Sequence, residues 1–98
     1  MDIMNLFDLT GKVVVVTGGG DGIGAGCCRI LAAAGASVIV SDISIDKAKA
    51  VADEIVATGG NAMPVACNVL QDDDLVNLID TAIKTYGTVN ILVNNAGL

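Results

Sequence analysis

Histidine is absent from this 98-residue sequence, so no histidine base and no histidine metal ligand can come from it. Lysine and arginine are scarce as well: five of them stand against 11 aspartates and glutamates, which gives a net charge of −6. Binding to the nucleic-acid phosphate backbone depends on clustered Lys and Arg. The sequence therefore predicts no nucleic-acid partner.

Cysteines are few, odd in number and poorly spaced for joint chemistry. The three are Cys27, Cys28 and Cys67, and no two of them form a Cys-x-x-Cys pair. We expect them to be small buried hydrophobes that stay reduced, because free cysteine is among the most buried residue types. We expect no metal site.

Long apolar runs are also missing, since none reaches the roughly 18 to 20 residues that cross a bilayer. Residues 1–5 lack the basic start and the apolar stretch of a secretory signal peptide. We therefore expect a cytoplasmic protein with no membrane partner. Disorder is excluded too, because 53% of the residues are hydrophobic and an unfolded chain requires low hydrophobicity.

What the sequence does contain is an alternation of strand and helix patterns. Continuous apolar or β-branched runs predict strands buried on both faces of a sheet, and apolar residues spaced by three and four predict helices. Ser44 suits the N-cap of the second helix, and a glycine follows each helix. The predicted strands are residues 12–17, 37–41, 62–66 and 89–93, and the predicted helices are residues 22–34, 45–58 and 71–86.

Two of these helices have informative faces. In the first, Ile23, Cys27 and Ile30 follow helical spacing, and in the third an apolar stripe runs through residues 75–86. Three aspartates at residues 72–74 occupy the first turn of the third helix, where the helix dipole favours negative charge. We interpret them as a solvated helix start.

The element order predicts an α/β fold: the first half of a Rossmann-type doubly wound parallel sheet with right-handed crossovers. In the dinucleotide-binding version of this fold the strand order is 3-2-1-4, so the third strand lies at an edge. Pro64 agrees with that order, because proline cannot donate to a ladder and belongs in an edge strand. We treat residues 1–98 as one unit.

The segment from Thr17 to Gly24 contains five glycines between the first strand and the first helix. Glycine allows a sharp turn, lets the backbone approach a pyrophosphate, and lets the helix pack closely on the sheet. The helix N-terminus then offers free N–H groups to a phosphate, so no lysine is needed. A Walker P-loop is excluded, because Gly-Lys-Ser/Thr is missing.

Asp42 supplies the second part of a dinucleotide site. It follows the second strand, 18 residues after Gly24, against the usual spacing of about 20. A carboxylate there accepts hydrogen bonds from the adenosine ribose and repels the 2′-phosphate of NADP. No Lys or Arg stands at residues 41, 43 or 44 to compensate, so the sequence favours NAD. The alternative is that Asp42 only caps the second helix.

Together these motifs resemble the short-chain dehydrogenase/reductase family. The resemblance rests on Thr17-Gly-x-x-x-Gly-Ile-Gly24, on Asp42, and on Asn94-Asn95-Ala96-Gly97 after the fourth strand. It covers the chain from about Leu9 to its end. Within the family, the register is most similar to bacterial NAD-dependent 7α-hydroxysteroid dehydrogenases.

The resemblance implies a role for particular residues in binding the cofactor NAD. Gly18, Gly22 and Gly24 would form the phosphate turn, and Ile23 would touch the cofactor through its backbone. Asp42 and Ile43 would hold the adenosine ribose.

The same resemblance implies two further contacts. The family usually has an Asp and an apolar residue that read the adenine amino group, and here the pair is Asn68-Val69. Asn still accepts through its side-chain oxygen, so we expect a modest weakening only. Asn95 would lie beside the cofactor's ribose, or would act as a structural Asn that bonds the backbone, and both roles are compatible.

Catalysis is expected to lie outside this chain. The family uses a Ser and a Tyr-x-x-x-Lys pair in the half that follows, whereas Tyr86 is followed at the fourth position by Asn90 and lies on an apolar helix face. We therefore expect the N-terminal piece of a dehydrogenase with no catalytic residue of its own. Residues 1–98 alone should be inactive and fold poorly, because the fourth strand would be a bare apolar edge.

The resemblance implies an oxidoreductase that transfers a hydride between NAD and a small secondary alcohol or ketone, with a hydroxysteroid or bile acid as one candidate, and a homo-oligomer at full length. Three alternatives stay open. One is a 3-oxoacyl-carrier-protein reductase or a sugar or alcohol dehydrogenase of the same family. Another is a stand-alone nucleotide-binding or regulatory module without catalysis. A methyltransferase is the third, although it has no use for Asn-Asn-Ala-Gly.

Overall fold

The computed structural model describes residues 8–96. Residues 1–5, which were tested for a signal peptide, and Gly97 of the Asn-Asn-Ala-Gly motif lie outside this range. Strands and helices alternate along the described chain, as the periodicities predict. In chain order they are β1 (Val13–Thr17), α2 (Gly22–Ala33), β2 (Ser37–Asp42), α3 (Ile45–Ala57), β3 (Asn61–Ala66), α4 (Asp72–Tyr86) and β4 (Ile91–Asn94).

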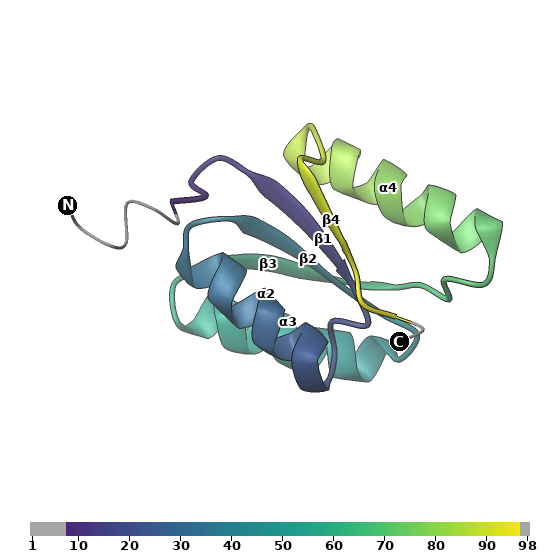
Figure 1. Cartoon of the computed structure of the whole chain (residues 1–98), viewed down its shortest axis with the longest axis horizontal. Helices are drawn as coiled ribbons and strands as arrows, with labels where there is room; N and C mark the ends of the chain where they lie inside the picture. Colours follow the sequence, from purple (N-terminus) through teal and green to yellow (C-terminus); the bar gives the residue numbers. More distant parts are fainter. Residues whose placement is uncertain (1–7, 97–98) are drawn as a thin grey trace.

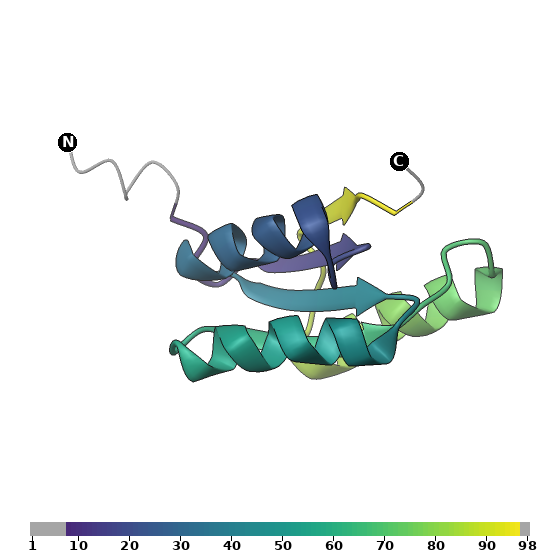
Figure 2. The same ribbon diagram turned by 90° about the horizontal axis from the view of Figure 1, so that it is seen from below.

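The four strands form one parallel sheet in the order β3-β2-β1-β4, which confirms the predicted fold class. Helices α2 and α3 cover one side of the sheet and α4 covers the other (Figures 1 and 2). Pro64 lies in β3, which pairs only with β2 among the described strands. The missing proline N–H is therefore tolerated, because the outer side of an edge strand has no ladder to complete.

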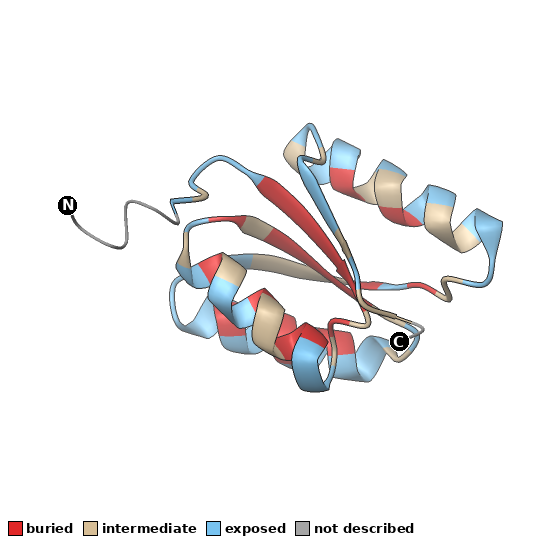
Figure 3. Ribbon diagram, in the orientation of Figure 1, coloured by how far each residue is buried: buried red, intermediate tan, exposed pale blue. Residues whose placement is uncertain are grey.

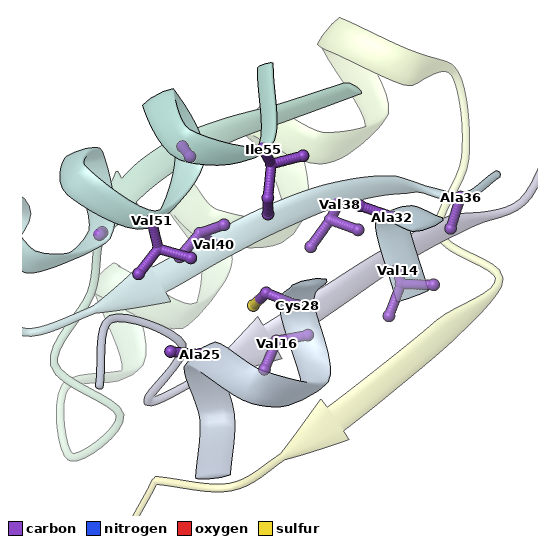
Figure 4. Packing of buried hydrophobic residues seen from close by; sticks show 12 residues of the cluster. Val14, Val16, Ala25, Cys28, Ala32, Ala36, Val38, Val40, Val51 and Ile55 are labelled. Carbon is purple, nitrogen blue, oxygen red and sulfur yellow. The ribbon is translucent and has the colours of Figure 1, made fainter. Parts of the chain in front are cut away.

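The sheet separates two groups of buried side chains, because successive residues of a strand point to opposite faces. We call them the α2–α3 core and the α4 core. The α2–α3 core, seen in Figure 4, consists of Val14, Val16, Ala25, Cys28, Ala32, Ala36, Val38, Val40, Ala48, Val51, Ala52 and Ile55. The α4 core consists of Val15, Ile39, Val65, Cys67, Leu78 and Ala82. Burial is densest on β1, β2 and the helix faces turned toward them (Figure 3).

The start of β4 differs from the prediction: the strand begins at Ile91 and not at residue 89. Asn90 explains the difference. Its N–H donates to the Val13 carbonyl at 2.9 Å, and its side-chain oxygen accepts from the Val13 N–H at 2.8 Å. A side-chain carbonyl thus replaces the backbone carbonyl that a ladder would use there, and regular pairing starts one residue later, at Val14 and Ile91.

The buried face of α2 also differs from the expectation. Ile23 and Ile30 are exposed, whereas the small residues Ala25, Cys28 and Ala32 are buried against the sheet. The small side chains form the face of α2 that packs on the sheet, because they let the helix approach the strands closely. Cys27 is only half-buried, so the prediction of three buried cysteines is wrong at that position.

Helix α4 keeps its predicted stripe in part. Leu78 and Ala82 are buried, and Leu75 and Tyr86 pack against the same core. Ile83 is 47% exposed, so the predicted stripe is buried only in part. Across residues 8–96, no helix combines the length and apolar character needed to cross a membrane.

Candidate functional site

The carboxyl ends of the four strands lie together at one edge of the sheet. In the register, Thr17 of β1 pairs with Asn94 of β4, and Asp42 of β2 pairs with Ala66 of β3. All three β–α connections therefore leave the sheet at this edge. In open α/β sheets this is the edge at which ligands bind.

The glycine turn between β1 and α2 needs its glycines for two separate reasons. Gly18 and Gly22 have positive φ angles of 64° and 52°, a region that disfavours residues with a Cβ. Gly24 has an ordinary φ, but a Cβ there would overlap the Gly18 carbonyl oxygen and come within 2.7 Å of the Asn95 amide nitrogen. At Gly20 a Cβ would lie 2.7 Å from Lys47 and 2.9 Å from Asp42. The space next to Gly22 is open, as a site for a close-lying ligand requires.

Thr17 ties this turn to the end of β4. Its hydroxyl donates to the Asn94 side-chain oxygen at 3.1 Å and accepts from the N–H groups of Asn95 and Ala96 at 3.0 and 3.2 Å. The Asn95 side chain donates to the Gly18 carbonyl at 3.2 Å. Asn95 therefore holds the backbone of the glycine turn, which is the structural role predicted as one of its two possibilities.

Asp42 joins the glycine turn to the start of α3. One carboxylate oxygen accepts from the Gly20 N–H at 3.0 Å, and the other accepts from the Ser44 N–H at 3.0 Å. Ser44 itself caps α3, with its hydroxyl accepting from the Lys47 N–H at 3.4 Å. A carboxylate offers about four acceptor positions, so Asp42 keeps capacity for a ligand while it orders both segments.

A second acid, Asp21, stands at the N-cap of α2. Its carboxylate accepts from the Gly22 N–H at 2.8 Å and pairs with the Lys47 ammonium at 3.3 Å. The hydrogen bond from Lys47 and that from the Gly22 N–H hold the pKa of Asp21 below its usual range. Lys47, which lies on α3, is thus directed at the glycine turn.

A cavity of about 260 Å³ opens at this edge of the sheet. It is lined by Gly18, Asp42, Ile43, Cys67, Asn68, Val69, Leu70 and Ala96. Five of the nine predicted site residues therefore share one cavity, although they come from three different strand ends. Gly22 and Ile23 lie at the exposed start of α2, Gly24 is buried behind them, and Asn95 supports the turn.

The loop from Asn68 to Gln71 forms one wall of this cavity. The Asn68 side-chain oxygen, which we expected to be available to adenine, accepts from the Leu70 N–H at 3.0 Å. A carbonyl oxygen has two lone pairs, so one position remains. The Asn68 N–H donates to the Asp74 carboxylate at 2.9 Å. The interpretation of all three aspartates at residues 72–74 as a solvated helix start is therefore wrong for Asp74.

Large apolar side chains are exposed around the cavity. Leu70 is 85% exposed, Ile23 is 80% exposed and Ile43 is 72% exposed. Burial raises the pKa of the Cys67 thiol, which keeps that part of the wall neutral. The surroundings thus combine one carboxylate with apolar surface, which suits a ligand that has both hydroxyls and a flat ring.

Residues 8–96 contain no group of three or more Cys, Asp or Glu side chains arranged to hold a metal ion. Tyr86 is far along α4, half-buried, with its hydroxyl donating to the Asn61 side chain at 3.3 Å. A larger groove of about 600 Å³ lies at the other end of the strands, between α2 and α3, and includes Arg29 and Glu54. It receives none of the predicted site residues.

Sequence reasoning missed four residues that shape the site: Thr17, Gly20, Lys47 and Cys67. The first two belong to the glycine motif, so their place in the sequence was a usable signal. Lys47 becomes relevant only because α3 packs against the glycine turn. Cys67 becomes relevant because it directly follows β3, whose end lies at the cavity. Neither carries a local signal.

Comparisons with known proteins agree with this geometry. The family profile described as short chain dehydrogenase matches residues 12–98. A 7α-hydroxysteroid dehydrogenase of Escherichia coli (strain K12) is 48% identical over 89 residues, which is 91% of this chain and 35% of the relative. A cyclohexanol dehydrogenase of Acinetobacter sp. (strain SE19) is 41% identical over 87 residues, 89% of this chain and 35% of the relative.

A solved structure of a 7α-hydroxysteroid dehydrogenase in complex with NADH and 7-oxo glycochenodeoxycholic acid superposes with a TM-score of 0.95. It is 45% identical, and the match covers all of this chain and 38% of that one. The chain thus spans about a third of the length of the relatives it matches.

Proposed function

This chain belongs to the short-chain dehydrogenase family, and from that membership we propose that residues 1–98 are the NAD-binding portion of an oxidoreductase. The observation that carries the proposal is the shared cavity, which brings the glycine turn, Asp42 and the Asn68 loop to one place. When bound, NAD supplies the hydride acceptor. The residues of this chain bind it, orient it and order the turn around it.

Each predicted residue has a proposed task. The N–H groups at the start of α2 that Asp21 does not bind face the pyrophosphate together with the positive end of the helix dipole, and Gly18, Gly22 and Gly24 leave the space for it. Ile23 contributes its backbone at the same place. Asp42 accepts from the ribose hydroxyls, and Ile43 covers the ribose.

The adenine end has its own residues. Asn68 and Val69 form the wall against which the ring lies, with the free acceptor position of Asn68 facing the amino group. Asn95 orders the glycine turn from behind and lies beside the second ribose. The exposed apolar side chains Ile43 and Leu70 lose contact with water when the cofactor covers them.

The preference for NAD over NADP follows from charge. Asp42 places a carboxylate where a 2′-phosphate would lie, and Lys47, the cation on the neighbouring helix, is paired with Asp21. Lys47 could offset the charge of a 2′-phosphate only by leaving this exposed ion pair with Asp21.

For the whole protein we propose oxidation of a secondary alcohol, with a 7-hydroxysteroid as the substrate class. The resemblance to 7α-hydroxysteroid dehydrogenases, at 45–48% identity, supports this class. A small cyclic alcohol is the second candidate, supported by the similar cyclohexanol dehydrogenase. The proton transfer and the oligomeric contacts are assigned to residues outside this chain.

The test compares cofactors in the full-length gene product that contains this chain. We expect Asp42→Ala to weaken NAD binding at least about 10- to 100-fold, the loss expected for one charge-assisted hydrogen bond to the ribose. Asp42→Asn keeps one of the two acceptor oxygens, so it retains the hydrogen bond from either the Gly20 or the Ser44 N–H group. It should therefore disturb the turn less than Asp42→Ala does, while narrowing the preference for NAD over NADP. Titration calorimetry and kcat/KM with both cofactors measure these effects.

Asp46→Ala is the matched control, because Asp46 is an exposed acid in the first turn of α3. It removes the same charge near the same helix without touching the cavity, and NAD affinity should stay within about twofold. A wild-type protein that prefers NADP would refute the assignment of Asp42. A protein that binds NAD but oxidises no alcohol would instead favour the stand-alone binding module.

A further inference from the structure

The first turn of α4 contains three aspartates, and only Asp74 reaches back to the chain before the helix. Its carboxylate accepts from the Asn68 N–H at 2.9 Å, six residues earlier in the sequence. Asp74 is the third residue of α4, where an acid commonly reaches the N–H of the N-cap residue. Here the N-cap is Gln71, whose N–H donates to the Asn68 carbonyl at 2.9 Å instead. The Asp74 carboxylate is thus used to hold the loop and not to cap its own helix.

Asn68 is held from three sides. Its N–H is bound by Asp74, its carbonyl accepts from the Gln71 N–H, and its side-chain oxygen accepts from the Leu70 N–H at 3.0 Å. The last two bonds close the loop on itself. The bond to Asp74 is the one that joins the closed loop to α4.

The other end of the loop is fastened to β2. The Cys67 N–H donates to the Asp42 carbonyl at 2.9 Å. The cavity wall formed by Cys67, Asn68, Val69 and Leu70 is therefore suspended between two anchors, one at the ribose-facing acid and one at Asp74. Cys67 and Val69 also pack on the α4 core, so loss of the bond to Asp74 would loosen Asn68 within the wall and leave the rest of the wall in place.

We propose that Asp74 is a positioning residue for the adenine half of the dinucleotide, acting through the Asn68 N–H. This rests on the proposed function, in which the Asn68 loop faces adenine. Asp74 does not line the cavity, so its effect is indirect: it sets the position of Asn68. The neighbouring Asp72 and Asp73 are exposed and share only the favourable interaction with the helix dipole.

The experiment separates the adenine half of the ligand from the nicotinamide half. In the full-length gene product we measure binding of NAD and AMP by titration calorimetry, and of nicotinamide mononucleotide by ligand-observed NMR. Asp74→Ala should weaken AMP and NAD by the same factor, about five- to tenfold, which is less than the direct loss of a hydrogen bond to a charged group because Asp74 acts only through Asn68. Nicotinamide mononucleotide should be unaffected.

Two variants and one control define the cause. Asp74→Asn keeps an oxygen acceptor at the same place and should stay within about twofold of wild type. Asp73→Ala removes an acid from the same helix turn without touching Asn68, so AMP affinity should not change. Asp74→Glu keeps the charge and a stable helix start but displaces the carboxylate by one methylene, and it should weaken AMP about threefold even if Asp74→Ala fails to fold.

Each alternative outcome has a distinct meaning. If Asp74→Ala and Asp74→Glu bind AMP as Asp73→Ala does, Asp74 is not a positioning residue. The same holds if Asp74→Ala weakens nicotinamide mononucleotide as much as AMP, because the effect is then on the whole fold. If Asp74→Asn is as weak as Asp74→Ala, the hydrogen bond is not the cause. If the wild type binds neither NAD nor AMP, the proposed function fails, independently of Asp74.

Discussion

The two faces of the sheet differ in how completely they are covered. On the α2–α3 side, two helices bury a continuous core in which Val14, Val16, Val38 and Val40 are wholly inaccessible. On the α4 side a single helix covers a smaller core, and Leu92 of β4 remains 54% exposed. In Figure 3 the exposed edge strand β4 contrasts with the buried β1 and β2; of its exposed residues, Leu92 faces the α4 side and Ile91 the α2–α3 side.

Because of this difference, one part of the candidate site is backed by a closely packed core and the other part is not. The glycine turn and Asp42 are backed by the complete α2–α3 core, so their geometry is set by close packing. The Asn68 loop and the end of β4 belong to the α4 side, where a second cavity of about 480 Å³ extends past Leu75, Ile79 and Leu92. On the proposed function, pyrophosphate and ribose would meet a preformed surface, whereas the position of Asn68 in the wall proposed for adenine depends on individual hydrogen bonds.

The close approach of α2 to the sheet gives the largest expected effect. Gly24→Ala places a Cβ on the Gly18 carbonyl oxygen, and backbone cannot move aside as a flexible side chain does. We expect a loss of about 3 kcal/mol or more in the free energy of unfolding, together with the loss of NAD binding. Urea titration and calorimetry on the full-length protein measure both.

Gly26→Ala, two residues along the same helix, is the control. A Cβ there meets nothing within 4 Å, so the variant should be more stable by about 0.5 to 1 kcal/mol, since alanine is the better helix former. Equal effects of the two substitutions would contradict the view that α2 lies in van der Waals contact with the glycine turn.

The α4 core supplies the next effect. Leu78 is one of its largest buried side chains, and Leu78→Ala should lower the free energy of unfolding by about 2 to 3 kcal/mol. The control Val76→Ala lies two residues away, is 61% exposed, and should change the stability by less than about 0.5 kcal/mol.

Hydrogen exchange sharpens the same comparison. Amides of β4 and α4 should open at lower free energy than those of β1 and β2, because fewer buried contacts protect them. A uniform protection pattern, or similar costs for Leu78→Ala and Val76→Ala, would show that the two faces are equally well packed.

Burial of Cys28 in the α2–α3 core predicts a smaller effect, which is a dependence of the free energy of unfolding on pH. Burial raises the pKa of the Cys28 thiol to about 12, well above the ordinary value for a cysteine. Between pH 9 and pH 12 the unfolded thiol loses its proton while the folded thiol keeps it, so stability falls as the pH rises, by about 1.4 kcal/mol per pH unit. Below pH 9 both forms are protonated and this contribution is constant.

Urea titrations of the wild type and of Cys28→Ala between pH 8 and pH 11 test this. The variant should show a shallower decline with pH, whatever the cavity costs at neutral pH. Parallel declines would mean that Cys28 ionises in the folded protein and that water reaches the α2–α3 core.

Much of the fold is predictable from local features. The apolar runs of β1 and β2 and the caps at Ser44 and Gly87 mark elements whose positions the structure confirms within a residue or two. Pro64 identifies an edge strand correctly, because a missing N–H is a property of the residue itself. The order 3-2-1-4 comes from the dinucleotide-binding version of the fold, with which Pro64 agrees, because alternation and crossover handedness alone admit other strand orders.

The candidate site is predictable only where a single segment of the sequence contains a recognisable motif. The glycine turn and Asp42 are such cases, since each follows a strand at a characteristic spacing. The exposure of Ile23 and Ile30 was not predictable, because helical spacing does not say which of two apolar stripes meets the sheet. The role of Asn90, just before β4, was not predictable either, because its side chain accepts a hydrogen bond from Val13, 77 positions away in the sequence.

By itself the sequence determined the alternation of strands and helices, the glycine turn after β1 and the acid after β2, because backbone conformation and hydrophobic periodicity act over a few residues. Only the tertiary structure decided that Gly20 and Gly24 must lack a Cβ, that Lys47 pairs with Asp21, and that Asp74 holds the Asn68 loop. The physical reason is that these contacts form between segments brought together by packing. Their partners are set by three-dimensional distance, which no local propensity records.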